Sequence, residues 1–123
     1  TEVPTASFYM IAVPTPLGPD NAPDITYVEA AARAIAPKIL PGACVIVEST
    51  SPVGTTERVA AIIAELRPDL AVPRDGSTDE ADIALAYCPE RVLPGRIVNE
   101  LVHNDRVIGG VTAACAERAA VLY

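Results

Sequence analysis

The chain has 123 residues, half of them hydrophobic, and a formal net charge of −7 at pH 7. A chain of this length forms a single domain with one hydrophobic core. Its acidic balance and its lack of a dense Lys/Arg cluster argue against a nucleic-acid partner, because the phosphate backbone would be repelled. The apolar stretches are too short to cross a bilayer and no signal-peptide pattern opens the sequence, so we expect a soluble, cytoplasmic protein with no membrane partner.

The first predicted strand spans residues 8–13, a continuous apolar run that ends at the motif PTP. Such a run is typical of a strand buried on both faces of a sheet. Asp24 then offers an N-cap for a helix that ends near Pro37. Apolar residues recur along this helix at helical spacing: Ile25, Val28, Ala32, Ile35 and Ile39.

A second strand and helix follow in the same order. Residues 44–47 repeat the signature of a buried strand, and the polar segment 48–54 interrupts it. A second helical stripe comes next, made of Val59, Ile62, Ile63 and Leu66. The strand–loop–helix unit therefore occurs twice.

The remainder of the chain predicts two more strands and one more helix. Residues 73–82 are polar and rich in turn formers, which favours an exposed loop. Residues 83–87 are expected to form the third strand and residues 106–110 the fourth. Thr112 is positioned to cap a last helix that runs through Leu122.

Strands that alternate with helices of this length pair in parallel through right-handed crossovers. The predicted fold class is therefore α/β, a Rossmann-like parallel sheet with helices on both faces. Ligands of such folds bind at the carboxyl ends of the strands. The segments 14–16, 49–56 and 88–95 follow three of the predicted strands, so we expect them to meet at one edge of the sheet.

Two threonines in these segments could bind an anion. Thr50 and Thr56 bring hydroxyls and backbone N–H groups to a helix start, where the helix dipole favours a pyrophosphate. The sequence contains no G-x-G-x-x-G, however, so the usual phosphate-binding turn of a dinucleotide fold is missing. Taken singly, these segments also fit a plain structural explanation, in which prolines end strands and Ser or Thr cap helices.

Four motifs carry a resemblance to a known family. In chain order they are IAVPTP, ESTSPVGTTE, YCPERVLPGRIVNE and NDRVIGG. Together they resemble the nucleotide-sugar 6-dehydrogenase family, and within it the branch that acts on UDP-N-acetyl-D-mannosamine. The resemblance covers nearly the whole chain and implies that residues 1–123 are a single, partial NAD-binding Rossmann-like domain, the second half of that domain.

The family resemblance implies an enzymatic reaction. The C6 alcohol of the sugar is oxidised to a carboxylate, with NAD as the cofactor and an aldehyde and a cysteine thioester on the way. It also implies a homodimer for the full-length enzyme. Glu90 is the implied catalytic carboxylate, which would help to activate the water that hydrolyses the thioester, together with Thr50.

The resemblance also assigns contacts with the two ligands. The positions that match NAD contacts are Thr15, Ser49, Thr50 and Thr56. The positions that match substrate contacts are Arg91 and Val92.

The peptide CPERVLPG separates branches of the family. Members that oxidise UDP-glucose resemble P-E-F-L-x-E-G at this place. Here Glu90 is kept, Arg91 and Val92 replace the Phe-Leu pair, and Pro94 stands where a second carboxylate would be. A guanidinium at position 91 can bond diphosphate or sugar oxygens in a fork, which a phenyl ring cannot.

We expect Glu90 to be partly buried among apolar neighbours of the same peptide, namely Pro89, Val92 and Leu93. The alternative is that Glu90 does no more than form an ion pair with a nearby arginine.

The cysteines and the histidine are given no catalytic role. Three cysteines are an odd number and lack the spacing of a metal site, so we expect no metal. Cys88 lies close to Glu90 in the sequence, but Cys44, Cys88 and Cys115 are all interpreted as small, buried apolar residues. His103 is expected at the surface or at a cap.

Other functions remain open at this point. The nucleophilic cysteine and the catalytic lysine of the family have no counterpart here, since the chain's single lysine is Lys38 in the first helix. We therefore expect the 123-residue chain on its own to be inactive. The alternatives are a UDP-N-acetylglucosamine 6-dehydrogenase, or an inactive α/β binding or assembly module derived from the same fold.

Overall fold

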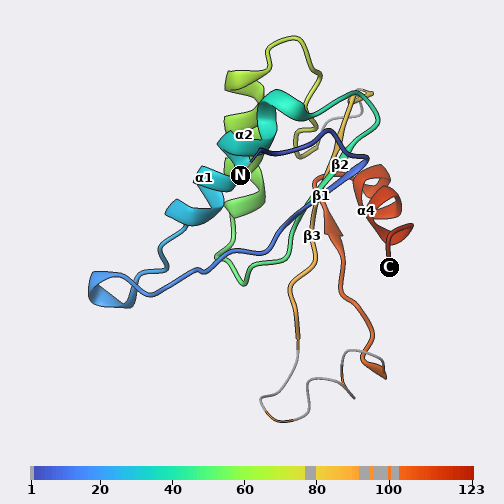
Figure 1. The fold of residues 1–123 in the computed structure, drawn as a ribbon. Coiled ribbons are helices and arrows are strands. Elements are labelled where there is room, and N and C mark those ends of the chain that lie inside the picture. Colours follow the sequence, from blue (N-terminus) through green and yellow to red (C-terminus); the bar gives the residue numbers. More distant parts are fainter. Residues whose placement is uncertain (1, 77–79, 92–94, 96–99, 101–102) are drawn as a thin grey trace.

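The structure is a computed structural model, which describes residues 2–76, 80–91, 95, 100 and 103–123 (Figure 1). Strands and helices alternate as predicted over most of the described chain. Their bounds are β1 (Phe8–Ile11), η1 (Pro19–Asn21), α1 (Thr26–Ile35), η2 (Ala36–Lys38), β2 (Cys44–Val47), α2 (Thr55–Leu66), β3 (Ala84–Tyr87), β4 (Gly109–Gly110) and α4 (Ala113–Ala120).

The four strands form one sheet in the order β1-β2-β3-β4. β1 and β2 pair in parallel, with Phe8 opposite Cys44, and β2 and β3 also pair in parallel, with Cys44 opposite Ala84. These pairings confirm the predicted Rossmann-like α/β class. The carboxyl ends of the three parallel strands consequently lie at the same edge of the sheet.

The fourth strand differs from the prediction. It was expected over residues 106–110 in a sheet of parallel strands, but β4 has two residues and is antiparallel to β3. The reason is the path of the chain, which leaves β3 at the carboxyl edge and enters β4 from that same side (Figure 1). The sheet is therefore mixed.

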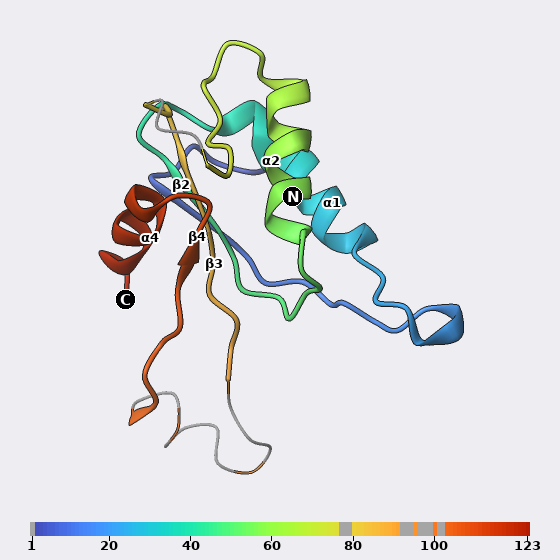
Figure 2. The ribbon, with the colours of Figure 1, turned by 180° about the vertical axis from the view of Figure 1, so that it is seen from behind.

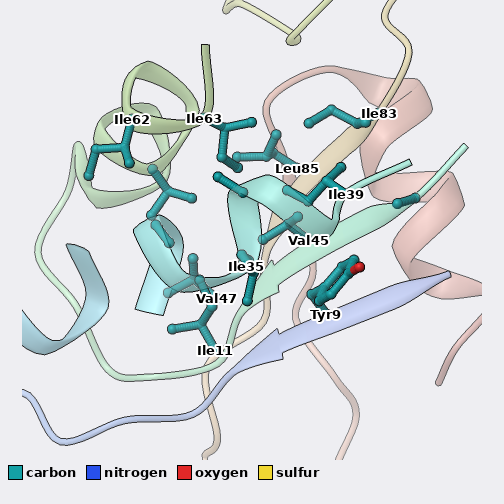
Figure 3. Packing of buried hydrophobic residues seen from close by; sticks show 14 of the residues in the cluster. Tyr9, Ile11, Ile35, Ile39, Val45, Val47, Ile62, Ile63, Ile83 and Leu85 are labelled. Carbon is teal, nitrogen blue, oxygen red and sulfur yellow. The ribbon is translucent and has the colours of Figure 1, made fainter. Parts of the chain in front are cut away.

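Helices cover both faces of the sheet, as predicted. Figure 2 shows α1 and α2 on one side of the strands and α4 on the other. The larger core lies between the sheet and the first pair of helices; Figure 3 shows its labelled members Tyr9, Ile11, Ile35, Ile39, Val45, Val47, Ile62, Ile63, Ile83 and Leu85. The smaller core, under α4, contains Cys44, Ile46, Ala84, Ala86, Cys88, Cys115 and Ala119.

These two cores explain why β2 is an unbroken apolar run. Successive strand residues point to opposite faces. Val45 and Val47 therefore contact the larger core, while Cys44 and Ile46 contact the smaller one, and all four are fully buried.

β1 is buried on one face, which corrects the prediction of two buried faces. Tyr9 and Ile11 belong to the larger core, but Met10 is 49% exposed and Phe8 is half-buried. β1 is the edge strand of the sheet, and α4 packs against β2 and β3 rather than over Met10. The guanidinium of Arg118 lies over the Phe8 ring, 4.8 Å from its centroid.

The N-cap of α1 is Ile25 rather than the predicted Asp24, whose side chain bonds instead to the first residue of the helix. An Asp24 carboxylate oxygen accepts hydrogen bonds from the backbone N–H of Thr26, at 2.8 Å, and from its hydroxyl. Thr112 caps α4, since its hydroxyl accepts from the backbone N–H of Cys115 at 3.3 Å. Leu66 was predicted to lie on the apolar face of the second helix, but it lies in the last turn of α2 and is 43% exposed.

The polar segment 73–82 lies partly outside the described residues. Pro73 is buried, whereas residues 74–76 and 80–82 are exposed. The backbone of Asp82 is tied to the fold, since its N–H donates to the Ala71 carbonyl at 2.8 Å and its carbonyl accepts from the Gly42 N–H at 2.6 Å. Across the described residues, no helix combines the length and hydrophobicity that a membrane crossing requires.

Candidate functional site

The segments that follow β1 and β2 are bonded to each other at the carboxyl edge of the sheet. The Thr15 hydroxyl donates to the backbone carbonyl of Thr50 at 2.7 Å. On the other side of β2, the backbone N–H of Ser51 donates to the Tyr87 hydroxyl at 3.2 Å. Polar segments from three strands are thus joined, as the predicted topology requires.

Ser49 is the most buried of the predicted cofactor contacts, with 8% of its surface exposed. Its hydroxyl accepts a hydrogen bond from the backbone N–H of Val13 and lies 2.7 Å from the Val13 carbonyl oxygen, to which it can donate. The side chain therefore ties the end of β1 to the end of β2. The contact of Ser49 with NAD stays a prediction.

The start of α2 lies at the same edge. Gly54 precedes the helix with φ of 92°, a left-handed backbone conformation that residues other than glycine rarely adopt. Thr55 is buried and its hydroxyl donates to the Pro52 carbonyl at 2.8 Å, so it closes the turn. Thr56, one residue further on, is half-buried.

A cavity of about 250 Å³ opens beside this helix start. Its lining comes from the segment before α2, the first turn of α2, the end of β3, and β4 with the residue after it: Ser51, Pro52, Val53, Gly54, Thr55, Thr56, Glu57, Tyr87, Gly109, Gly110 and Val111. Tyr87 was not among the predicted site residues. The sequence signal that could have identified Tyr87 as a site residue is its position at the carboxyl end of a predicted buried strand.

Glu90 departs from its predicted environment. Glu90 was expected to be partly buried among apolar neighbours, but its side chain is 41% exposed, and its carboxylate forms an ion pair with Arg106 at 2.9 Å. The other carboxylate oxygen accepts from the backbone N–H of Arg91 at 3.0 Å. Val92 and Leu93, expected to help bury it, lie outside the described residues. The ion pair with a nearby arginine is therefore present, and a catalytic role of Glu90 stays a prediction.

Arg91, predicted to contact the substrate, is exposed. Its carbonyl accepts a hydrogen bond from the side-chain amide of Asn104 at 3.1 Å, which links the segment after β3 to the segment before β4. Val92, the second predicted substrate contact, lies outside the described residues.

A second group of side chains lies on the α4 side of the edge. Arg106 lies over the ring of Tyr123, 5.1 Å from the ring centroid, and the Tyr123 hydroxyl donates to a Glu48 carboxylate oxygen at 2.5 Å. Burial, followed by hydrogen bonds with Glu48 and Cys88, raises the pKa of Tyr123 well above its ordinary value. Tyr123 therefore remains a neutral hydrogen-bond donor at any physiological pH.

All three cysteines are buried, which confirms their interpretation as core residues. Burial raises the pKa of the Cys44 thiol to about 11, so this group is a thiol rather than a thiolate near neutral pH. His103 is exposed. Within the described ranges, no group of three or more His, Cys, Asp or Glu side chains is arranged to hold a metal ion.

The site residues thus fall into two sets. Thr15, Ser49 and Thr50 are brought together at the ends of β1 and β2, with Thr56 nearby at the start of α2. Glu90 belongs instead to the group with Arg106 on the α4 side. The carboxyl ends of adjacent parallel strands hold both sets at one edge.

Comparison with known proteins identifies similar chains. The chain is 58% identical, over 118 residues, to UDP-N-acetyl-D-mannosamine dehydrogenase of Escherichia coli strain K12, covering 96% of this chain and 28% of that protein. It is 53% identical, over 123 residues, to NDP-N-acetyl-D-galactosaminuronic acid dehydrogenase of Ralstonia solanacearum, covering all of this chain and 29% of that one. The chain therefore spans less than a third of the length of these curated relatives.

Solved structures show the same likeness in three dimensions. A UDP-D-ManNAc dehydrogenase from Pyrococcus horikoshii superposes with a TM-score of 0.82 at 42% identity, over 98% of this chain and 27% of that one. The UDP-N-acetyl-mannosamine dehydrogenase from Staphylococcus aureus gives a TM-score of 0.80 at 42% identity, over 98% and 28% of the two chains. A family model, described as the NAD binding domain of the UDP-glucose/GDP-mannose dehydrogenases, matches residues 1–123. The chain therefore belongs to the UDP-glucose/GDP-mannose dehydrogenase family, within that family's NAD binding domain.

Proposed function

We propose that this chain is part of an NAD-dependent nucleotide-sugar 6-dehydrogenase that oxidises the C6 alcohol of UDP-N-acetyl-D-mannosamine to the uronate. One observation carries the proposal: in a chain of this family, the segment after β2 is hydrogen-bonded both to the segment after β1 and to Tyr87, the last residue of β3, at the edge where such sheets bind ligands. The names of several of its relatives and structural neighbours support the choice of substrate.

The residues at this edge fit part of a dinucleotide. Thr56 supplies a hydroxyl beside the cavity at the start of α2, where backbone N–H groups and the helix dipole favour an anion or a ribose oxygen. Thr15 and Thr50 flank the neighbouring strand ends, and Ser49 holds their segments together. The glycine-rich turn that grips the pyrophosphate does not occur in these residues, so they account for part of the NAD site.

The chemistry of the whole reaction is a four-electron oxidation. One alcohol, one water and two NAD⁺ give one carboxylate, two NADH and three protons, so that atoms and charges balance. NAD supplies the hydride acceptor when bound. The nucleophilic cysteine and the lysine that the family resemblance implies have no counterpart in this chain, so turnover belongs to the longer polypeptide.

This chain's own contribution to the chemistry lies at Glu90 and Thr50. A carboxylate oxygen of Glu90 can accept a proton from the water that attacks the acyl group, while the Thr50 hydroxyl can orient that water. Both residues follow adjacent parallel strands, so they lie at the same edge of the sheet. The exposed Glu90 side chain is accessible to such a water.

The choice of sugar is a finer part of the proposal. Arg91 and Val92 are the proposed substrate contacts, and Arg91 is exposed after β3, where its guanidinium is available to diphosphate or sugar oxygens. Relatives above 50% identity carry names with two different N-acetylhexosamine derivatives. A cytoplasmic homodimer is the proposed working form, because the reaction consumes NAD and a UDP-sugar and the family resemblance implies a dimer.

The test is NADH formation by the full-length polypeptide that contains this chain. UDP-N-acetylmannosamine, UDP-N-acetylglucosamine and UDP-glucose are supplied in parallel, and absorbance at the NADH band is followed to completion. Two NADH per UDP-N-acetylmannosamine, with little from the other two sugars, is the expected result. A preference for UDP-N-acetylglucosamine would replace the proposed substrate, and no NADH from any of the three would overturn the proposed activity.

A further inference from the structure

Glu90 is held by donors at both of its carboxylate oxygens. One oxygen accepts from the backbone N–H of Arg91 at 3.0 Å and the other from the guanidinium of Arg106 at 2.9 Å. A carboxylate with a fixed donor on each oxygen has a fixed orientation. The Glu90 side chain is 41% exposed, so a water can reach the lone pairs that these two donors leave free.

Arg106 is in turn held by a neighbour other than Glu90. Its side chain is 28% exposed and its guanidinium lies 5.1 Å from the centroid of the Tyr123 ring. The Tyr123 hydroxyl donates to Glu48, which directly follows β2. Four side chains therefore form a connected chain, Glu48–Tyr123–Arg106–Glu90, which we call the carboxyl-edge clamp.

The clamp joins parts of the molecule that are far apart in sequence. It connects the residue after β2, the residues that follow α4, the segment before β4 and the segment after β3. Glu48 lies two residues before Thr50. The clamp therefore links the backbones that carry both proposed catalytic residues, Thr50 and Glu90.

A surface ion pair on the helical face shows what the clamp adds. Arg58 and Glu29 are 2.7 Å apart, with exposures of 46% and 27%, and they join α2 to α1 on the surface. Such exposed pairs contribute little to stability. Arg106 combines a similar ion pair with a cation–π contact, and its partner Glu90 stands at the ligand-binding edge.

We propose that Arg106 is a positioning residue, which acts on the reaction through Glu90 by fixing the direction of its carboxylate. This inference rests on the proposed function, in which Glu90 accepts a proton from water. Tyr123 holds the guanidinium in place, and Glu48 holds Tyr123. Loss of the clamp therefore slows the chemical step without weakening NAD binding. The proposed NAD contacts Thr15, Ser49 and Thr56 are not among the four side chains of the clamp.

The experiment uses the full-length polypeptide with UDP-N-acetylmannosamine and NAD. The variants are Arg106→Gln, Arg106→Lys, Tyr123→Phe, Glu90→Gln and the double variant Glu90→Gln/Arg106→Gln. The matched control is Arg58→Gln, which breaks an ion pair of similar length and exposure on the helical face. For each protein, kcat, the KM for each substrate and the circular dichroism spectrum are measured.

The expected result is a loss of kcat of about 10- to 100-fold in Arg106→Gln, because a misplaced catalytic group costs this much. The KM for NAD stays within about twofold, Arg106→Lys recovers part of the rate, and Tyr123→Phe loses less than Arg106→Gln. The double variant is no slower than Glu90→Gln alone, since both changes remove the same interaction. Arg58→Gln retains the wild-type kcat.

Two outcomes overturn the inference while leaving the proposed function intact. One is an Arg106→Gln variant with wild-type kcat, and the other is a double variant whose loss is the product of the two single losses. If Arg106→Gln does not fold, Arg106→Lys together with Tyr123→Phe decides: unchanged kcat in both overturns the inference. A wild-type polypeptide that forms no NADH overturns the proposed function, and this inference with it.

Discussion

The Ser49 hydroxyl and the backbone of Val13 form a closed pair of contacts, with the Val13 N–H donating to the hydroxyl at 2.7 Å and the Val13 carbonyl oxygen also 2.7 Å away. Val13 comes after β1 has ended, where its backbone no longer has the regular partners of a strand. Ser49 replaces those partners from the neighbouring chain segment. The buried Ser49 side chain is thus one of the groups that hold the site edge together.

Replacement of Ser49 by alanine is therefore expected to destabilise the fold. Loss of the hydroxyl leaves the Val13 N–H and carbonyl without this partner, which costs about 1–3 kcal/mol in the free energy of unfolding. Urea unfolding of the chain, followed by circular dichroism, measures the change. Ser51→Ala is the control, because its half-buried hydroxyl donates to a single carbonyl, that of Ser49, and we expect a smaller loss. Equal stabilities of Ser49→Ala and wild type would contradict this role.

Thr56 is expected to act on NAD affinity rather than on stability. The variant Thr56→Val keeps the shape of the side chain and removes its hydroxyl beside the cavity. Loss of one hydrogen bond weakens NAD binding by about 3- to 10-fold. Calorimetric titration of the full-length polypeptide with NAD measures the dissociation constant of NAD. Thr26→Val, at the start of α1, is the control, and an equal effect in both variants would refute a specific contact.

Gly110 and Gly109 provide a matched pair of neighbours in β4. A Cβ at position 110 would lie 2.3 Å from the Ala116 backbone nitrogen and 2.4 Å from the Thr112 carbonyl oxygen, whereas one at position 109 meets nothing within 4 Å. Gly110→Ala must push α4 away from the sheet, at a cost of about 1–3 kcal/mol or more. Gly109→Ala is expected to be neutral or slightly stabilising. Thermal unfolding of both variants tests this, and equal melting temperatures would show that α4 is not packed this closely.

The Cys44 thiol predicts how stability depends on alkaline pH. Burial raises its pKa in the folded state from 9.0 to about 11. The unfolded chain therefore loses this proton first, so the contribution of Cys44 to stability is complete below about pH 9 and is lost as the pH rises to about 11. Urea unfolding at several pH values should give a shallower decline for Cys44→Ala than for wild type. Val45→Ala is the control, since it also opens buried space without removing a titrating group. An identical decline of the unfolding free energy with pH in wild type and both variants would exclude Cys44 as a source of the pH dependence.

The sequence predicted those parts of the fold that depend on local patterns. The unbroken apolar run at β2 required two covered faces, and the helical spacing in α1 and α2 required one core on the same side of the sheet. Thr112 capped its helix as expected, because capping involves residues three positions apart. The edge that carries Thr15 and Thr50 also followed, since parallel strands place their carboxyl ends together.

The remainder depends on contacts between distant residues. The antiparallel direction of β4 is set by the path of the chain after β3, which residues 106–110 do not encode in their own pattern. The exposure of Met10 follows from the place of β1 at the edge of the sheet. Glu90 finds its partner in Arg106, and Tyr123 finds Glu48 from the far end of the chain. Sequence periodicity contains no information about these pairs.

The order of the strands in the sheet has a consequence for synthesis of the chain. Each of the four described strands pairs with the described strand that comes next along the sequence, so these pairings form between near neighbours in the chain. As the polypeptide leaves the ribosome, β1, α1 and β2 can dock before β3 has been made, and each later strand adds to an edge that already exists. Ribosome-stalled chains of increasing length should therefore become resistant to protease in steps, first when α2 has emerged and again when α4 has emerged.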